Sequence, residues 1–118
     1  MGYMRHHALV ITGSDYPESK KIIRKVHRMS KDRAIDYVGT SKIVSPLMYS
    51  PLNGYLSFFI APDGSKEGWQ ESELGDSMRD SIIDFIDSFT YEDGSLCINY
   101  TEVFYGDEEG RSEVERHN

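Results

Sequence analysis

The sequence has a single cysteine, Cys97, among its 118 residues. One thiol excludes an internal disulfide and any zinc site built on several cysteines. Long apolar runs are also missing, since no stretch approaches the roughly 20 residues that a membrane-spanning helix requires. The first residues, MGYMRHHALV, lack the length and the small-residue cleavage site of a signal peptide. We therefore expect a soluble, cytoplasmic protein with no membrane partner.

The motifs of common catalytic and phosphate-binding sites are absent too. There is no GxSxG, GxxxxGK[ST], GxGxxG or HExxH, and no paired HxT or HxS. Histidines are present, but His6 and His7 are adjacent on an expected strand and would point to opposite faces. We therefore predict no metal site and no cofactor, and the sequence favours a binding protein over an enzyme.

Positive charge is scarce overall and concentrated near one end. The chain has 13 Lys and Arg against 20 Asp and Glu, a net charge of −7. Residues 1–42 hold 9 bases and 4 acids, a difference of +5, whereas residues 43–118 hold 4 bases and 16 acids, a difference of −12. The overall charge disfavours extended nucleic acid as a partner, while a compact nucleotide is compatible with the basic part.

The pattern of apolar residues predicts one domain of the α+β class. Strands are expected over residues 6–12, 43–49, 55–60 and 96–105, with amphipathic helices starting near residues 15 and 76, the first ending near residues 30–33. This order is that of the ferredoxin-like βαββαβ sandwich, an antiparallel sheet with two helices on one face. In this arrangement the first and third strands are central, and the second and fourth lie at the edges. The second strand carries Pro46, which suits an edge position.

The end of the chain has a different composition. Residues 106–118 are rich in acids and poor in apolar side chains. Such a segment lacks the apolar surface that would hold it on a core. We expect a domain of residues 1–105 followed by an acidic flexible tail of residues 106–118.

Candidate ligand-binding residues lie in the first helix and in two loops. Arg24 and Arg28 are one helical turn apart, a spacing that suits several phosphate oxygens. In the long loop of residues 61–76, Lys66 offers an ammonium group and Trp69 a flat ring for a base. Alternatively, the basic helix face is simply solvated, and Trp69 covers the core. We predict a pocket for a small phosphorylated nucleotide made by Arg24, Arg28, Asn53, Tyr55, Ser65, Lys66 and Trp69.

Two other functions remain open on the sequence alone. Asp80, Asp84 and Asp87 on the outer face of the second helix could mimic nucleic acid and inhibit a basic partner protein. A small oligomeric enzyme would instead use His6 or His7 as general base in a pocket between subunits. Because the sheet face opposite the helices has no cover, we also expect a homo-oligomer.

Residues 53–69, with Arg5-His6-His7-Ala8 before them and residues 91–95 after them, resemble small accessory proteins encoded by bacteriophages. The resemblance covers most of residues 4–110. It implies a non-enzymatic protein that counters host defence in the cytoplasm of the host cell. Such a protein would sequester a nucleotide signal or bind a host defence protein, although fold alone implies neither.

Overall fold

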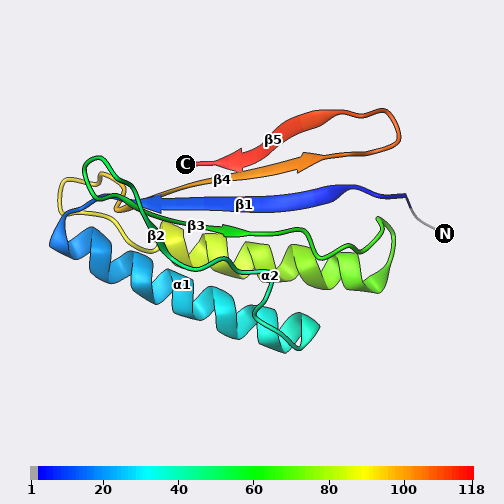
Figure 1. Cartoon of the computed structure of the whole chain (residues 1–118), viewed down its shortest axis with the longest axis horizontal. Helices are drawn as coiled ribbons and strands as arrows, with labels where there is room; N and C mark the ends of the chain where they lie inside the picture. Colours follow the sequence, from blue (N-terminus) through cyan, green and yellow to red (C-terminus); the bar gives the residue numbers. More distant parts are fainter. Residues whose placement is uncertain (1–2) are drawn as a thin grey trace.

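In the computed structural model, which describes residues 3–118, one antiparallel sheet carries two helices on one of its faces (Figure 1). The α+β class predicted from the sequence is confirmed. The first two residues of the predicted domain lie outside the described part. In chain order, the elements are β1 (His6–Gly13), α1 (Pro17–Val38), β2 (Met48–Tyr49), β3 (Leu56–Ile60), α2 (Gln70–Asp87), β4 (Ile98–Tyr105) and β5 (Ser112–His117).

The strands lie in the order β2-β3-β1-β4-β5, and each neighbouring pair is antiparallel. Central β1 pairs on both sides, so that Leu9 lies opposite Ile60 of β3 and Glu102 of β4. Edge strand β2 is shorter than the predicted residues 43–49, and Val44 makes only an isolated bridge to Ile60. Pro46 accounts for this interruption, because its nitrogen has no hydrogen to donate to the ladder.

The last residues differ from the prediction of a flexible tail. Ser112–His117 form β5, which pairs with β4 and makes β4 an interior strand instead of the predicted edge. The fifth strand also takes the whole sheet beyond the four-stranded order predicted from the sequence. Acidic composition was a poor guide here, because the strand is held by its ladder and by paired charges, notably those of Arg116.

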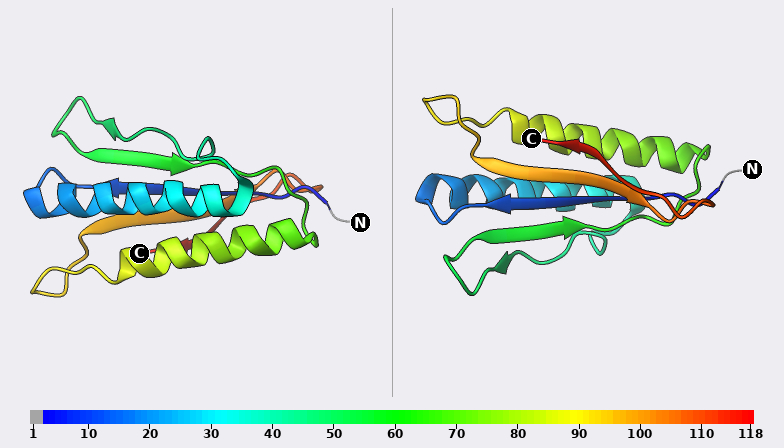
Figure 2. Two further views of the ribbon diagram at one scale, coloured as in Figure 1. Left: turned by 90° about the horizontal axis from the view of Figure 1, so that it is seen from below. Right: turned by 90° about the horizontal axis from the view of Figure 1, so that it is seen from above.

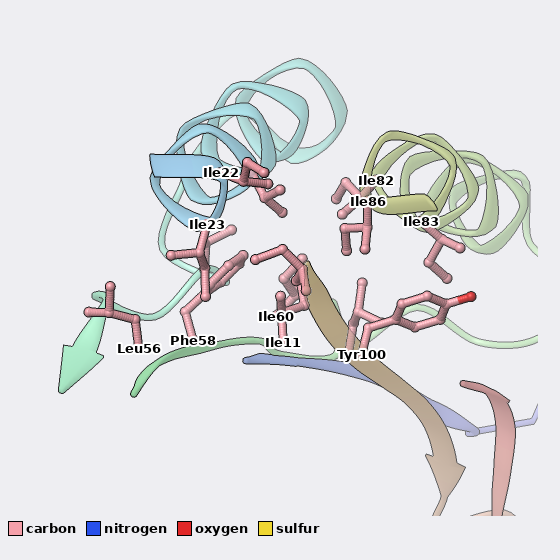
Figure 3. Packing of buried hydrophobic residues seen from close by; sticks show 14 of the residues in the cluster. Ile11, Ile22, Ile23, Leu56, Phe58, Ile60, Ile82, Ile83, Ile86 and Tyr100 are labelled. Carbon is pink, nitrogen blue, oxygen red and sulfur yellow. The ribbon is translucent and has the colours of Figure 1, made fainter. Parts of the chain in front are cut away.

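The core lies between the helices and one face of the sheet (Figure 3). Ile22, Ile23 and Val26 of α1 are buried at helical spacing, as the sequence predicted. The helix continues to Val38, past its predicted end, because Ala34 extends the buried stripe by another two turns. Facing side chains come from α2 and three strands: Ile82, Ile86, Leu9, Ile11, Phe58, Ile60 and Tyr100. Neither helix in residues 3–118 is both long and apolar enough to cross a membrane.

A buried carboxylate interrupts this apolar layer toward β5. Glu102 of β4 is 2% exposed, and its Oε1 accepts a hydrogen bond from Arg116 Nε at 2.6 Å. Arg79 of α2 places its Nε 3.2 Å from Oε2, an ionic contact without hydrogen-bond alignment. Arg79 also pairs with Asp76 at 2.5 Å, and Arg116 pairs with Asp80 at 2.7 Å. The Glu102 network therefore ties α2, β4 and β5 together.

Removing one partner of the buried carboxylate is expected to destabilise the fold. We predict that Arg116→Ala lowers the free energy of unfolding by about 3 kcal/mol, because Glu102 loses its best-aligned partner while staying buried. The control Arg24→Ala removes an exposed guanidinium that donates only to the Tyr49 hydroxyl, and it should cost less than about 1 kcal/mol. Urea unfolding measures both; equal losses in the two variants would contradict the prediction.

Candidate functional site

A surface groove of about 490 Å³ lies between α1 and α2. Most of its lining comes from α1 at intervals of three and four residues, the spacing that puts side chains on one helix face. Phe85 of α2 forms the opposite wall. The groove, called the helix groove below, is lined by Lys25, Arg28, Met29, Asp32, Arg33, Asp36 and Phe85.

The charges of the helix groove favour a small anion. Lys25, Arg28 and Arg33 are exposed, and none of them forms an ion pair with any residue in the described chain, 3–118. Asp32 and Asp36 supply two carboxylates, so three positive and two negative groups leave a balance of +1. Flexible cations without a fixed partner are free to turn toward phosphate oxygens.

A second cleft, of about 370 Å³, lies where the end of α1 meets the loop before α2. Trp69 at its rim is 42% exposed, so this ring does not cover the core. Lys66 stands beside the cleft with its Nζ 5.9 Å from the centroid of the Trp69 ring. Within the described residues 3–118, the lining of this cleft contains no lysine or arginine. The cleft is lined by Tyr37, Val38, Asp63, Gly64, Ser65, Trp69, Glu71 and Leu74.

Asp63 fixes a negative charge in the second cleft. Its Oδ1 accepts hydrogen bonds from the backbone N–H of Ser65 at 2.8 Å and from the Ser65 hydroxyl at 2.6 Å, and its Oδ2 accepts one from the Tyr37 hydroxyl. Burial alone would raise the pKa of Asp63, but these hydrogen bonds and the nearby Arg79 charge outweigh it and lower that pKa. Burial and the Asp63 carboxylate together raise the pKa of Tyr37. The cleft therefore disfavours a phosphate group.

His7 lies beneath this cleft and is closed to a substrate. Its Nε2 is 2.6 Å from Glu67 Oε1, its Nδ1 is 3.1 Å from Glu115 Oε2, and the residue is 9% exposed. The space beside it is about 10 Å³, room for about one water molecule. His6 packs against the ring of Tyr105, with centroids 5.3 Å apart. Neither imidazole of this pair faces a cleft that could hold a substrate within one chain.

The predicted ligand residues that belong to the two loops lie apart from one another in the structure. Ser65 and Trp69 line the second cleft, and Lys66 flanks it. Asn53 and Tyr55 lie just before β3, whereas the other three follow it, so the length of the strand stands between the two groups. Asn53 has φ 62, the left-handed conformation that suits a turn. These five residues do not form one pocket.

The two predicted arginines of α1 are also separated. Arg28 lines the helix groove, but Arg24 donates a hydrogen bond to the Tyr49 hydroxyl at 2.9 Å, near β2. Lys25 and Arg33 were missed as site residues, although Lys25 lies three residues from Arg28 and Arg33 lies four residues from Met29, spacings that indicate a shared helix face. Phe85 could not be found in this way, because its place in the groove depends on how α2 packs against α1.

The acidic residues of α2 are not equivalent. Asp80 pairs with Arg116, which neutralises part of its charge, while Asp84 and Asp87 are exposed.

The Cys97 thiol is buried, and burial raises its pKa, the opposite of what a reactive thiolate requires. Among residues 3–118, no group of three or more His, Cys, Asp and Glu side chains is placed to hold a metal ion.

Comparison with known proteins adds no assignment to these clefts. No protein-family model and no curated protein matches the chain. The resemblance to bacteriophage accessory proteins therefore stays a prediction. The two clefts and the charges that line them are the observations that bear on function.

The ionised Asp63 is expected to make stability depend on acid pH. Because the pKa of Asp63 is lower in the folded chain than its ordinary value of 3.8, its contribution is present above about pH 4 and is lost as pH falls through the folded value. We predict that the wild type loses stability more steeply than Asp63→Asn between about pH 5 and pH 2. Urea unfolding at several pH values measures this; a constant difference between the two proteins would contradict it.

Proposed function

We propose that the protein is a non-catalytic binding protein that captures a small phosphorylated nucleotide in the helix groove. The observation that carries this proposal is the set of three unpaired cations, Lys25, Arg28 and Arg33, beside the apolar side chains of Met29 and Phe85. A nucleotide combines the two chemical features that such a groove accommodates, an anionic phosphate and a flat, weakly polar base.

Each part of the groove has a role in this proposal. Arg28 lies between the other two cations along α1, and its planar guanidinium can bind two phosphate oxygens at once. Phe85 offers its ring to the base. The carboxylates of Asp32 and Asp36 can accept hydrogen bonds from sugar hydroxyl groups. These acids also oppose highly charged ligands, so a ligand with one or two phosphates fits better than a polyphosphate.

Binding without turnover is supported by the chemistry of the same residues. The groove lining contains no histidine, cysteine, serine or threonine, the side chains that most often act as general base or nucleophile. The histidines of β1 are engaged elsewhere, His7 with two carboxylates and His6 with an aromatic ring. Capture and release of an unchanged ligand is therefore the proposed activity.

The wider role proposed here rests on the bacteriophage resemblance. A protein that holds a nucleotide without altering it would lower the concentration of a nucleotide signal used in host defence, in the cytoplasm of the host. We also propose that β1 to β4 and the two helices correspond to a ferredoxin-like arrangement, extended at one edge by β5.

Ligand binding gives the direct test of the groove. We predict that nucleoside monophosphates or cyclic dinucleotides raise the melting temperature, and that Arg28→Ala weakens binding about 10- to 100-fold, the effect of losing a charged hydrogen bond. Lys31→Ala is the control, since Lys31 is an exposed cation of the same helix that does not line the groove. Isothermal titration calorimetry compares both variants with the wild type.

The outcomes separate the candidate functions. Recovery of the nucleotide unchanged after heat denaturation supports capture, whereas an altered product contradicts the absence of catalysis. No binding of any nucleotide at millimolar concentration would overturn the proposal. Salt-sensitive binding to a basic protein that Asp84→Lys and Asp87→Lys abolish would favour the acidic inhibitor instead.

A further inference from the structure

The face of the sheet that points away from the helices is uncovered, as the view from above shows (Figure 2, right). Side chains on this face are identified by the strand register, because residues paired across antiparallel strands point to the same side. We call it the open face; it consists of His6, Ala8, Val10, Thr12, Met48, Ser57, Phe59, Asn99, Thr101, Val103, Tyr105, Ser112, Val114 and His117.

The open face carries no aspartate, glutamate, lysine or arginine at any of its fourteen positions. These four residue types make up 28% of the chain, so fourteen positions of average composition would hold about four of them. The other side of the same strands does carry charges, including Glu102 and Arg116. A sheet face that is exposed to water normally carries polar and charged side chains. Its composition is that of a surface which becomes buried.

Val10 and Phe59 form an apolar patch in the middle of the open face, and two hydroxyls of this face bond to each other. Val10 of the central strand is 43% exposed and lies opposite Phe59 of β3. Val114 of β5 is 57% exposed. Thr12 and Ser57 hydrogen-bond to each other at 2.9 Å, so covering these two hydroxyls leaves neither without a partner. Contact with another apolar surface would remove Val10, Phe59 and Val114 from water.

The area of the open face is that of a small interface between two proteins. The five strands have 8, 2, 5, 8 and 6 residues, 29 in all, so at about 3.3 Å per residue and about 4.8 Å between strands the sheet has a flat area of about 460 Å². Two such faces in contact would bury roughly 900 Å² together, the size of a weak or transient interface. A second copy of the chain supplies a face of equal area and equal lack of charge.

We propose that two copies of the chain associate through their open faces, related by a twofold axis. Packing the open face on the helices of a second copy would bury their exposed lysine, arginine and aspartate side chains, which is costly without partners. Face-to-face packing avoids this and closes with two copies. The inference is independent of nucleotide binding, because the helix groove lies on the other side of the sheet and stays accessible in both copies.

Sedimentation equilibrium of the full chain with one charged substitution tests the interface. We expect the wild type to reach twice the 13.5 kDa chain mass at concentrations up to about 100 μM. Val10→Glu brings two carboxylates to the centre of the paired faces, and it should weaken the dimer at least about 100-fold. The matched control is Val38→Glu at the end of α1, where the valine is 38% exposed and far from the open face; this variant should remain dimeric.

Sedimentation of folded variants decides whether the open face forms the dimer. Circular dichroism establishes whether Val10→Glu is folded; if it is not, Val114→Glu takes its place, since Val114 lies on the same face near the sheet edge. A folded open-face variant that is monomeric, beside a dimeric control, supports the proposal. A wild type that stays monomeric up to about 100 μM overturns it, as does a folded open-face variant that keeps the dimer mass.

Discussion

The central strand β1 has helices on only one side, and this one-sided cover organises the rest of the molecule. Leu9 and Ile11 meet the apolar stripes of α1 and α2, whereas Val10 between them faces away. The two helices lie along one face of the sheet, as the view from below shows (Figure 2, left). Apart from Glu102 of β4, the charged side chains lie on the helices, the loops and edge strand β5, and the open face has none.

The Glu102 network shows how a charge inside the core can order a segment of unpromising composition. A carboxylate that is 2% exposed requires cationic partners, and one of them, Arg116, is on β5. Pairing with Arg116 therefore holds the end of the chain on β4. The same arginine reaches Asp80 of α2, so one positive group at the end of the chain pairs with an acid of α2 and with the buried acid of β4.

Local patterns in the sequence were sufficient for the α+β class, for the positions of most strands and for the amphipathic character of both helices, but α2 begins at Gln70, inside the stretch of residues 61–76 that was predicted to be a loop. They were not sufficient for β5, because its stability comes from a ladder and from a carboxylate distant in the sequence. The predicted ligand set failed to come together for a similar reason. Asn53 and Ser65 are close in sequence, but an extended strand between them sets them apart, while Arg28 gains Phe85 as a neighbour through helix packing. Spacing within one helix is readable from sequence, and the meeting of two elements is not.

The two edges of the sheet are built differently from its open face. Edge strand β2 has only two residues, and Pro46 precedes it. At the opposite edge, β5 carries Glu113, Glu115 and Arg116, and a bulge shifts its register between Glu102 and Val103 of β4. Short length, proline, charge and bulges all oppose the addition of a further strand from another molecule. The two edges of the sheet therefore disfavour edge-to-edge aggregation, and the sheet stays at five strands.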